Sequence, residues 1–324
     1  MIKMPVILGP TACGKTAVAA RLAFELDGEV ISADSRQVYR GMDIGSGKDL
    51  DDYIVEGRTI PSHLINIAEA GYEYNIFEYQ RDFTQAFADI VSRGRLPILC
   101  GGSGMYLEAV LKGYSLPEVP PDPHFAENMK AMDDQALLRE LSRLKKLHST
   151  TDTVDRNRML RALEIEIKRR EPFNSTGPAA SASSKGRDPA GIGNSAVSTF
   201  SPVPGIIFGI NPGREIVRQR ITSRLKSRLS GGLTEEVGNL LSKGIPPARL
   251  KAYGLEYKFI TQYIQGELDY DRMFSLLNTS IHQFAKRQMT WFRRMERQGM
   301  KIYWIEGELG TIERVKKIRE ELNR

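Results

Sequence analysis

The sequence predicts an α/β protein built on a parallel sheet, with a helical insertion domain and further helices toward the C-terminus. Two observations predict this class. Short apolar segments typical of buried strands alternate with segments of helical period, and a glycine-rich turn follows the first apolar segment. We expect strands over residues 6–8, 29–32 and 96–100, with helices over 16–26 and 77–92 between them. Ligands of such folds bind at the carboxyl ends of the strands.

The turn after the first strand matches a phosphate-binding loop, and this match predicts a P-loop NTPase-like core. Its residues are Gly9, Pro10, Thr11, Ala12, Cys13, Gly14, Lys15 and Thr16. The two glycines let successive N–H groups face an anion, and the following helix adds its positive N-terminal end. We expect Lys15 to reach the outer phosphates and Thr16 to hold Mg²⁺. The loop therefore predicts a phosphorylated ligand, without indicating which reaction follows.

Two further polar turns follow the second and third expected strands. Asp34 and Ser35 come after one, and Ser103 lies in a glycine-rich turn after the other. Taken alone, an Asp-Ser pair after a strand is typical of a helix N-cap. Because the carboxyl ends of parallel strands share one edge, we expect these turns and the phosphate loop to form a single site.

Composition changes along the chain predict its domain organisation. Charged helices are expected over 134–147 and 157–170, after a proline-rich stretch. Residues 174–205 are mostly small and polar, so they bury too little apolar surface to offset the entropy lost on ordering. A strand at 206–210 then precedes helices to the C-terminus. We expect a first core part at 1–116, a helical insertion at 117–150, a core helix at 151–173, a flexible low-complexity loop at 174–205, and core completion with basic helices at 206–324.

The charge pattern favours a polyanionic partner. Lys and Arg number 46 against 40 Asp and Glu, for a net charge of +6. The excess is concentrated in two segments, 214–228 and 286–297, which contain one acidic residue each. A solvated helix face is the ordinary explanation of such a run, but two runs in one phosphate-binding protein favour a polyanionic partner.

Composition also argues against several classes of protein. Two cysteines and four histidines without metal-ligand spacing disfavour a disulfide framework and a structural zinc site. No apolar stretch approaches the length that spans a bilayer. We therefore expect a monomeric cytoplasmic protein with no membrane partner.

Five segments in a fixed order carry a resemblance to a known family. They are the phosphate loop and residues 34–45, 101–107, 158–164 and 284–293. Together they closely resemble the tRNA dimethylallyltransferases, also called tRNA isopentenyltransferases. The resemblance extends from Pro5 to Ile305, apart from residues 174–205.

The resemblance implies a prenyltransferase that moves a dimethylallyl group from dimethylallyl diphosphate to N6 of adenosine 37 in the tRNA anticodon loop. The products are N6-isopentenyladenosine and diphosphate. The implied partners are dimethylallyl diphosphate and the tRNA anticodon stem-loop, and the implied cofactor is Mg²⁺. A base in a loop costs less to extrude than a paired one, which suits this substrate.

The resemblance implies that a few residues carry out the reaction. An exocyclic amine is a poor nucleophile and needs a proton acceptor, for which Asp34 is the candidate. The leaving diphosphate gains charge, which Lys15, Thr16 and the loop amides can stabilise, with Arg220 and Arg224 reaching in from the basic segment. Ser103 is a third catalytic candidate beside Asp34 and Arg220, since it stands where the family usually has Thr and retains the hydroxyl.

The resemblance also implies a set of tRNA contacts. These are Asp34, Ser35, Arg36, Gln37 and Ser103 around the site, Asn157, Arg158, Met159, Leu160 and Arg161 in the charged helices, and Lys286, Arg287 and Arg293 on the basic C-terminal helix. On that helix a stripe at helical spacing indicates core packing, and we expect Trp291 to be structural. The stripe comprises Ile281, Phe284, Ala285, Gln288, Phe292 and Met295.

Besides Ser103, the chain departs from the family pattern at three further places. Ser62-His63 replaces a His pair, residues 45–49 lack the usual Ala and Pro, and Glu256 replaces a basic residue near the expected tRNA face. Three other functions stay open: prenyl transfer to free AMP, ADP or ATP, a P-loop nucleotide kinase or NTPase, and a non-catalytic RNA-binding relative.

Overall fold

The computed structural model describes residues 3–114, 119, 122–129, 131–144, 156–170 and 201–324. These fall into two compact units. The first contains residues 1–114 and 200–324, and the second contains residues 115–199. The first unit carries the sheet and the phosphate loop.

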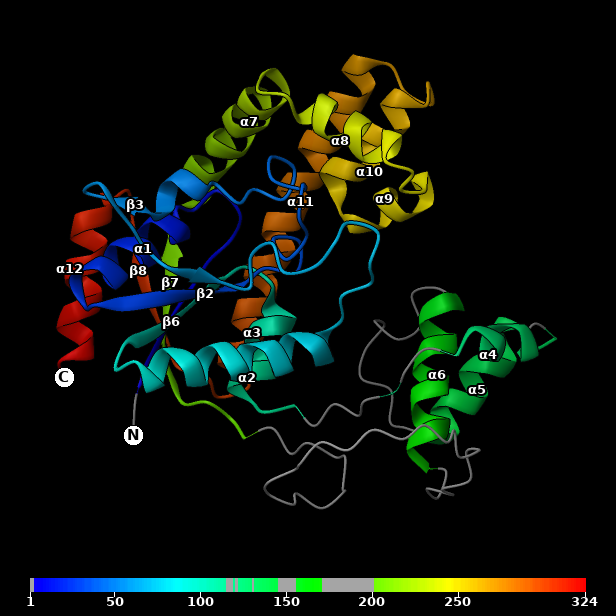
Figure 1. Cartoon of the computed structure of the whole chain (residues 1–324), viewed down its shortest axis with the longest axis horizontal. Coiled ribbons are helices and arrows are strands. Elements are labelled where there is room, and N and C mark those ends of the chain that lie inside the picture. Colours follow the sequence, from blue (N-terminus) through cyan, green and yellow to red (C-terminus); the bar gives the residue numbers. More distant parts are fainter. Residues whose placement is uncertain (1–2, 115–118, 120–121, 130, 145–155, 171–200) are drawn as a thin grey trace, which may run out of the picture. The chain divides into compact units, whose positions relative to one another are not determined.

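A six-stranded parallel sheet forms the centre of the first unit (Figure 1). Its strand order is β5-β2-β6-β1-β7-β8, and every neighbouring pair runs parallel. The strands are β1 (Met4–Leu8), β2 (Gly28–Ala33), β5 (Ser62–His63), β6 (Leu96–Gly101), β7 (Gly205–Asn211) and β8 (Ile302–Glu306). The predicted α/β class is confirmed. A short antiparallel pair, β3 (Ile54–Val55) and β4 (Arg58–Thr59), lies outside this sheet.

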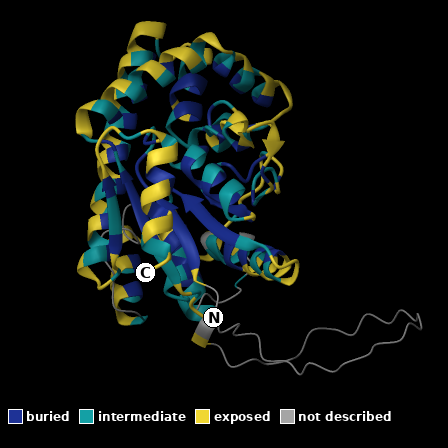
Figure 2. Cartoon of the chain, turned by 90° about the vertical axis from the view of Figure 1, so that its left-hand side faces the viewer, coloured by how far each residue is buried: buried dark blue, intermediate teal, exposed yellow. Residues whose placement is uncertain are grey.

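Helices cover both faces of the sheet, as the buried central strands in Figure 2 illustrate. One core cluster joins the sheet to α1 and α12, and another joins it to α2, α3 and the C-terminal half of α11. A third packs α7 to α11 against residues 38–42. The bounds are α1 (Lys15–Glu25), η1 (Leu50–Tyr53), α2 (Ile76–Ser92), α3 (Gly104–Leu111), α7 (Arg214–Ser230), α8 (Leu233–Ser242), α9 (Pro247–Tyr253), α10 (Leu255–Ile264), α11 (Tyr270–Arg297) and α12 (Thr311–Leu322).

Local sequence explains where the longest helices begin. Asn75 caps α2 through a reciprocal pair of bonds with Glu78, and the Asp269 side chain accepts a bond from Arg272 N at the start of α11. Along α11 the expected stripe is buried, except that Phe284 is only half-buried. The buried face of α11 packs with α7 to α10 at Ile281 and Ala285, and with the sheet at Phe292 and Met295.

The sequence analysis is wrong about the C-terminal region in one respect, because not only helices follow the strand at 206–210. Residues Ile302–Glu306 form β8, which extends the sheet beside β7. Ile302 and Ile305 are buried, and Tyr303 and Trp304 are partly buried. Residues 302–305 form a short continuous apolar run, which periodicity alone does not distinguish from a buried helix segment, and the sequence analysis missed this strand signal.

The second unit consists of α4 (Pro123–Asn128), α5 (Asp134–Leu144) and α6 (Arg156–Arg170). Its small core joins Leu137 and Leu141 of α5 to Leu160 and Leu163 of α6. The helix expected at 151–173 therefore belongs to the insertion rather than to the sheet core, because its apolar side chains find their partners on α5. Most of the loop expected at 174–205 lies outside the described residues.

Candidate active site

The turns after β2 and β6 are joined directly. Ser103 N donates to the carbonyl oxygen of Ala33 at 3.2 Å, and Ser103 Oγ accepts from Ser35 N at 3.1 Å. Gly101 allows this approach, since a Cβ there would lie 2.2 Å from the same Ala33 oxygen. Asp34 stands between Ala33 and Ser35, so the Asp34 and Ser103 turns form one wall.

The phosphate loop lies beside that wall. Gly14 has φ of +84°, a left-handed conformation that favours glycine, and it precedes Lys15 at the start of α1. A Cβ on Gly102 would lie 3.4 Å from Gly9 O and 3.6 Å from Lys15 Cε. The structure thus brings the three predicted turns together at the ends of β1, β2 and β6, which are neighbours in the sheet. On the α12 side, Arg314 Nη1 donates to the carbonyl oxygen of Cys13 at 3.0 Å.

Gln288 of α11 connects the two sides of this site. Its Oε1 accepts from Thr11 N at 2.8 Å, and its Nε2 donates to Gly102 O at 2.9 Å. The sequence analysis placed Gln288 among packing residues and missed this bridge. A polar amide within an otherwise apolar stripe is the signal that indicates it, because a buried amide requires partners.

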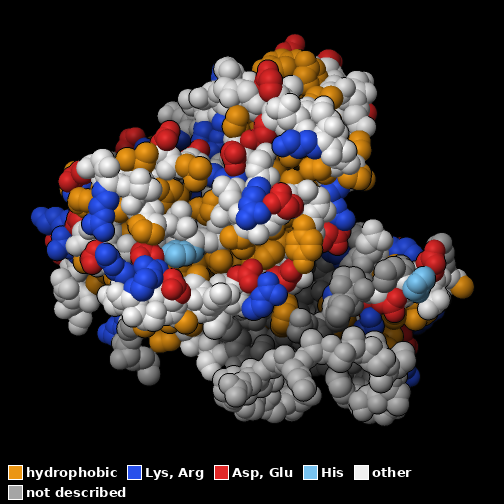
Figure 3. All heavy atoms as spheres, viewed as in Figure 1, with side chains coloured by type: hydrophobic (Ala, Val, Ile, Leu, Met, Phe, Trp, Pro, Cys, Tyr) orange, Lys and Arg blue, Asp and Glu red, His pale blue; other side chains and the backbone are white. Residues whose placement is uncertain are grey.

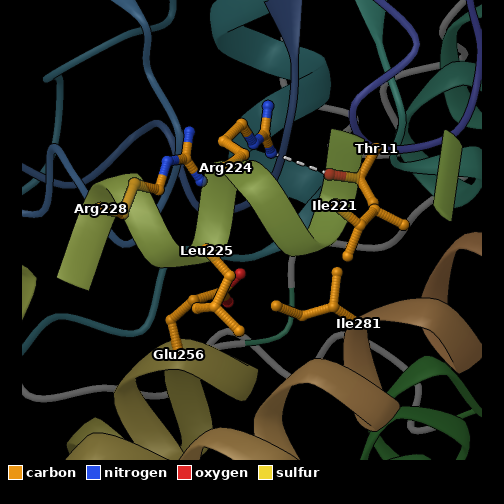
Figure 4. Close-up of a pocket in the computed structure, with 7 residues that line it drawn as sticks. All are labelled: Thr11, Ile221, Arg224, Leu225, Arg228, Glu256 and Ile281. Carbon is orange, nitrogen blue, oxygen red and sulfur yellow. Dashed lines mark hydrogen bonds between the residues drawn. The ribbon is translucent and has the colours of Figure 1, made fainter. Parts of the chain in front are cut away.

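Two arginines of α7 border the phosphate loop, and a pocket lies beside them (Figure 4). Arg224 Nη2 donates to Thr11 Oγ1 at 2.9 Å, while its Nη1 lies 3.2 Å from Asp49 Oδ2. Arg228 Nη2 lies 2.8 Å from Asp49 Oδ1. The pocket is lined by Thr11, Ile221, Arg224, Leu225, Arg228, Glu256 and Ile281.

Burial and neighbouring charges both shift the pKa values of Arg224 and Asp49. Burial lowers the pKa of Arg224, and the neighbouring Arg228 cation lowers it further. Burial alone would raise the pKa of Asp49, but Arg228 and Arg224 outweigh it and hold that pKa below the usual range. The sequence analysis included Arg224 among the phosphate-binding residues and missed the carboxylate that joins it to Arg228.

Arg220 stands one turn before Arg224 but has a different partner. Its Nη2 lies 3.6 Å from Glu308 Oε1, and its side chain is 39% exposed. Arg220 is therefore solvent-accessible and lies beside the segment that follows β8, and its catalytic role is still a prediction.

The segment that presents Asp49 is held by α8 and by its own internal contacts. Both Glu236 carboxylate oxygens accept backbone bonds, from Asp43 N and Ile44 N at 2.7 Å and from Gly45 N at 3.0 Å. Lys48 is buried and donates to the carbonyl oxygen of Tyr39 at 2.6 Å. The residues that depart from the family pattern at 45–49 thus form an anchored loop.

The segment from Asp34 to Gln37 is organised largely by internal contacts. Arg36 N donates to Asp34 Oδ1 at 3.0 Å. Gln37 is buried, accepting from Ser32 Oγ at 2.8 Å and donating to Gly47 O at 3.0 Å. A tRNA contact through the Gln37 side chain would need these bonds to break.

Glu256, which the sequence analysis placed near the expected tRNA face, has a buried side chain. It is 8% exposed, and its Oε2 accepts from Arg36 Nη1 at 3.0 Å. Burial opposes the charge of Arg36, but Glu256 and Asp34 outweigh it and raise the Arg36 pKa. The acidic residue at this position therefore balances the charge of Arg36.

The departure at Ser62-His63 lies in β5, where His63 contacts a buried carboxylate. His63 Nε2 is 2.7 Å from Glu29 Oε2.

Basic side chains of the first unit differ in their availability. Lys286, Arg287 and Arg293 on α11 are exposed, whereas Arg294 pairs with the fully buried Glu108 and stacks over Trp291 at 4.0 Å. Acidic and basic groups are interspersed on the face in Figure 3. The three α11 cations that the resemblance assigned to tRNA are therefore accessible, as are Arg272 and Arg297 of the same helix.

Trp291 packs beneath the Ser103 turn. A Cβ on Gly104 would lie 2.2 Å from its ring. This contact agrees with the expected structural role of Trp291.

The α6 residues expected to contact tRNA lie in the second unit. Asn157 and Arg158 are exposed, and Arg161 Nη1 pairs with Glu164 at 2.6 Å. Met159 and Leu160 are instead buried, at 5% and 7% exposure, and Leu160 belongs to the small core of that unit.

A metal at this site would rely on few protein ligands. Thr16 places a hydroxyl in the first turn of α1, beside Lys15. Within the described residues no group of three or more His, Cys, Asp or Glu side chains could hold a metal ion. This donor set fits Mg²⁺, which keeps several waters and is bound through one or two protein oxygens and substrate phosphates.

The described part of the chain has no helix long and apolar enough to cross a membrane.

Family models match most of the chain. The IPP transferase model matches residues 37–295, and the isopentenyl transferase model matches residues 2–66. Among curated proteins, the chain is 51% identical over 307 residues to tRNA dimethylallyltransferase 2 of Porphyromonas gingivalis, covering 94% of each. It is 50% identical over 309 residues to tRNA dimethylallyltransferase 1 of Parabacteroides distasonis, covering 95% of this chain and 94% of that protein.

Solved structures show the same fold. The tRNA isopentenylpyrophosphate transferase of Bacillus halodurans matches with a TM-score of 0.67 and 28% identity, over 100% of this chain and 96% of that one. A eukaryotic dimethylallyltransferase structure matches with a TM-score of 0.70 and 21% identity, over 94% and 74% of the two chains.

Proposed function

The chain belongs to the IPP transferase family, and we propose that it transfers a dimethylallyl group from dimethylallyl diphosphate to N6 of adenosine 37 in the tRNA anticodon loop. The products are N6-isopentenyladenosine and diphosphate. The observation that carries this proposal is the contact between the Asp34 and Ser103 turns and the phosphate loop. It places a carboxylate and a hydroxyl next to an anion-binding loop.

The donor diphosphate binds at the phosphate loop. Backbone N–H groups, Lys15 and Arg224 direct positive charge toward the group that gains negative charge as the allylic C–O bond breaks. Arg224 already bonds to Thr11 of the loop. Arg220 completes this cationic side once the diphosphate draws it away from Glu308.

The acceptor adenine enters on the opposite side, next to Asp34. Asp34 orients the N6 amine and takes its proton as the new C–N bond forms. Its carboxylate is oriented by the bond from Arg36 N, and Ser103 Oγ accepts from Ser35 N in the same wall. We therefore expect Ser103 to contact the acceptor or the diphosphate.

Mg²⁺ is the metal that the Thr16 hydroxyl and the diphosphate oxygens would hold. When bound, it neutralises charge on the leaving group. The protein contributes the hydroxyl, the lysine and the loop amides. Since the described residues hold no cage of acidic ligands, the ion would take its remaining ligands from the diphosphate and water.

Recognition of tRNA combines backbone contacts with one extruded base. Lys286, Arg287 and Arg293 are exposed and suited to phosphates. Asn157, Arg158 and Arg161 offer polar groups from the second unit. We expect a monomeric cytoplasmic enzyme that engages the anticodon stem-loop.

One alternative has a specific observation in its favour. The isopentenyl transferase model matches residues 2–66, which include the phosphate loop and Asp34. Transfer of the prenyl group to free AMP, ADP or ATP would use the same donor site. The helical insertion and the exposed cations of α11 favour tRNA as the acceptor.

Product analysis tests the proposal. The protein is incubated with Mg²⁺, dimethylallyl diphosphate and either tRNA or AMP, and nucleosides are identified by mass spectrometry. Isopentenyladenosine from tRNA alone is the expected result. Product from AMP alone would replace the proposal with the small-nucleotide alternative, and no product from either would contradict both.

A further inference from the structure

Arg36 connects the Asp34 turn to α10 and α11, two helices from the C-terminal part of the chain. Its backbone N–H donates to Asp34 Oδ1, and its guanidinium reaches Glu256 at the start of α10. The guanidinium carbon also lies 5.0 Å from the centre of the Phe284 ring on α11. The same residue thus fixes the carboxylate locally and ties it to the helical part of the unit.

The space around this side chain is closely fitted. Gly254, at the junction of α9 and α10, has φ of +148°. A Cβ there would lie 2.8 Å from Arg36 Nη1 and 2.9 Å from Arg36 Cδ. The Arg36 side chain therefore depends on a glycine at 254 and on an acceptor at 256.

The ion pair is shielded from water. The Arg36 and Glu256 side chains are 19% and 10% exposed. Removing one partner of a buried pair leaves the other charge uncompensated, which costs more than losing an exposed pair. By contrast, the nearby Arg40 and Glu69 side chains are 56% and 72% exposed.

From this geometry we propose that Glu256 is a positioning residue of the transferase, which acts through Arg36 to hold the Asp34 turn in its reactive arrangement. The proposal rests on the proposed function, in which Asp34 takes the proton of the acceptor amine. It explains why an acidic residue at 256 accompanies an arginine at 36. Misplacement of a reacting group by about 1 Å can cost on the order of 100-fold in rate.

Glu256 also lines the pocket beside Thr11 and Arg224. A role on that donor side would change the KM for dimethylallyl diphosphate. A role through Arg36 lowers kcat and leaves this KM unchanged, because Asp34 faces the acceptor. The split between kcat and KM therefore separates the two routes.

The test compares Glu256→Gln, Arg36→Ala and the double variant, with Glu69→Gln as the control that removes an exposed carboxylate. Steady-state transfer to tRNA is measured beside amide hydrogen exchange of residues 34–38. We expect Glu256→Gln to lower kcat by about 10-fold or more, with an unchanged donor KM and faster exchange. In the Arg36→Ala background the same change should have no further effect. Glu69→Gln should match the wild type.

Two results would overturn the proposal. One is an equal loss from Glu256→Gln in the presence and absence of Arg36, and the other is wild-type kcat and exchange in Glu256→Gln. If Arg36→Ala does not fold, Arg36→Lys takes its place in the same cycle. A wild-type protein that makes no isopentenyladenosine contradicts the proposed function instead, and the exchange measurement still decides whether Glu256 holds the turn.

Discussion

Gln288 Oε1 accepts a hydrogen bond from Thr11 N at 2.8 Å, across 277 residues of sequence. Through its Nε2 the same amide donates to Gly102 O. A helix near the C-terminus therefore sets the spacing between the phosphate loop, which begins at Gly9, and the Ser103 turn. The site is assembled only when α11 is in place.

Replacing Gln288 by Ala should loosen this connection. Thr11 N and Gly102 O would each lose a buried partner, at a cost of about 1–3 kcal/mol in the free energy of unfolding. The KM for dimethylallyl diphosphate should rise, because the loop amides are less well placed. Urea denaturation and donor kinetics measure the two effects. Gln283→Ala, an exposed change on the same helix, is the control, and equal behaviour of the two variants would argue against the bridge.

Replacing Asp34 by Ala should abolish transfer with little loss of tRNA binding. A positioned general base contributes about 10²- to 10⁴-fold to rate, and the exposed cations of α11 stay in place. Asp34→Asn is the matched variant, because its side-chain oxygen can still accept from Arg36 N while the base is lost. Single-turnover transfer and tRNA gel shift measure the two properties. Unchanged turnover in Asp34→Asn would remove Asp34 as the base.

The sequence predicts the phosphate loop and the joined turns well because these features are local. The spacing of Gly14 and Lys15 in the motif predicts the loop, and the buried strands before each turn are short apolar runs. That the turns meet follows from one rule about parallel strands. No distant contact is needed for any of these steps.

Other parts of the site depend on contacts that no local pattern encodes. Gln288 has helical spacing in common with its apolar neighbours, and only its partners reveal its role. The sequence places Glu256 near the expected tRNA face but gives no sign of its pairing with Arg36, because that contact depends on how α10 packs. The assignment of α6 failed for the same reason, since Leu160 and Leu163 meet partners on α5.

Replacing Asp49 by Asn should lower the free energy of unfolding only above acidic pH. Arg228 and Arg224 hold the Asp49 pKa below its ordinary value of about 3.9, against the opposing effect of burial. A lowered folded-state pKa means that the stabilisation is present above the ordinary value and disappears as pH falls through the lower one. Because the Asp49 side chain is 39% exposed, the effect at pH 7 should be about 0–1 kcal/mol.

Urea denaturation at neutral and acidic pH measures this difference, with Asp51→Asn as a charge-matched control in η1. The gap between wild type and Asp49→Asn should close at acidic pH. A gap that widens there would contradict the lowered pKa. The kcat of Asp49→Asn should also fall, since Arg224 loses one of its two fixed partners.

Replacing Lys15 by Ala separates prenyl transfer from nucleotide hydrolysis. Lys15 lies at the N-terminal end of α1, with its Cε close to the Gly102 turn. If the loop binds the leaving diphosphate, loss of this cation should lower kcat/KM for dimethylallyl diphosphate by about 10²- to 10³-fold, because one fixed group no longer meets the developing charge. Lys243→Ala, an exposed lysine after α8, should leave transfer unchanged. Transfer to tRNA and release of phosphate from ATP are measured in parallel on all three proteins. A defect confined to ATP hydrolysis would favour a P-loop NTPase, whereas a defect confined to transfer assigns the loop to the prenyl donor, since the same lysine cannot serve a reaction that its loss does not slow.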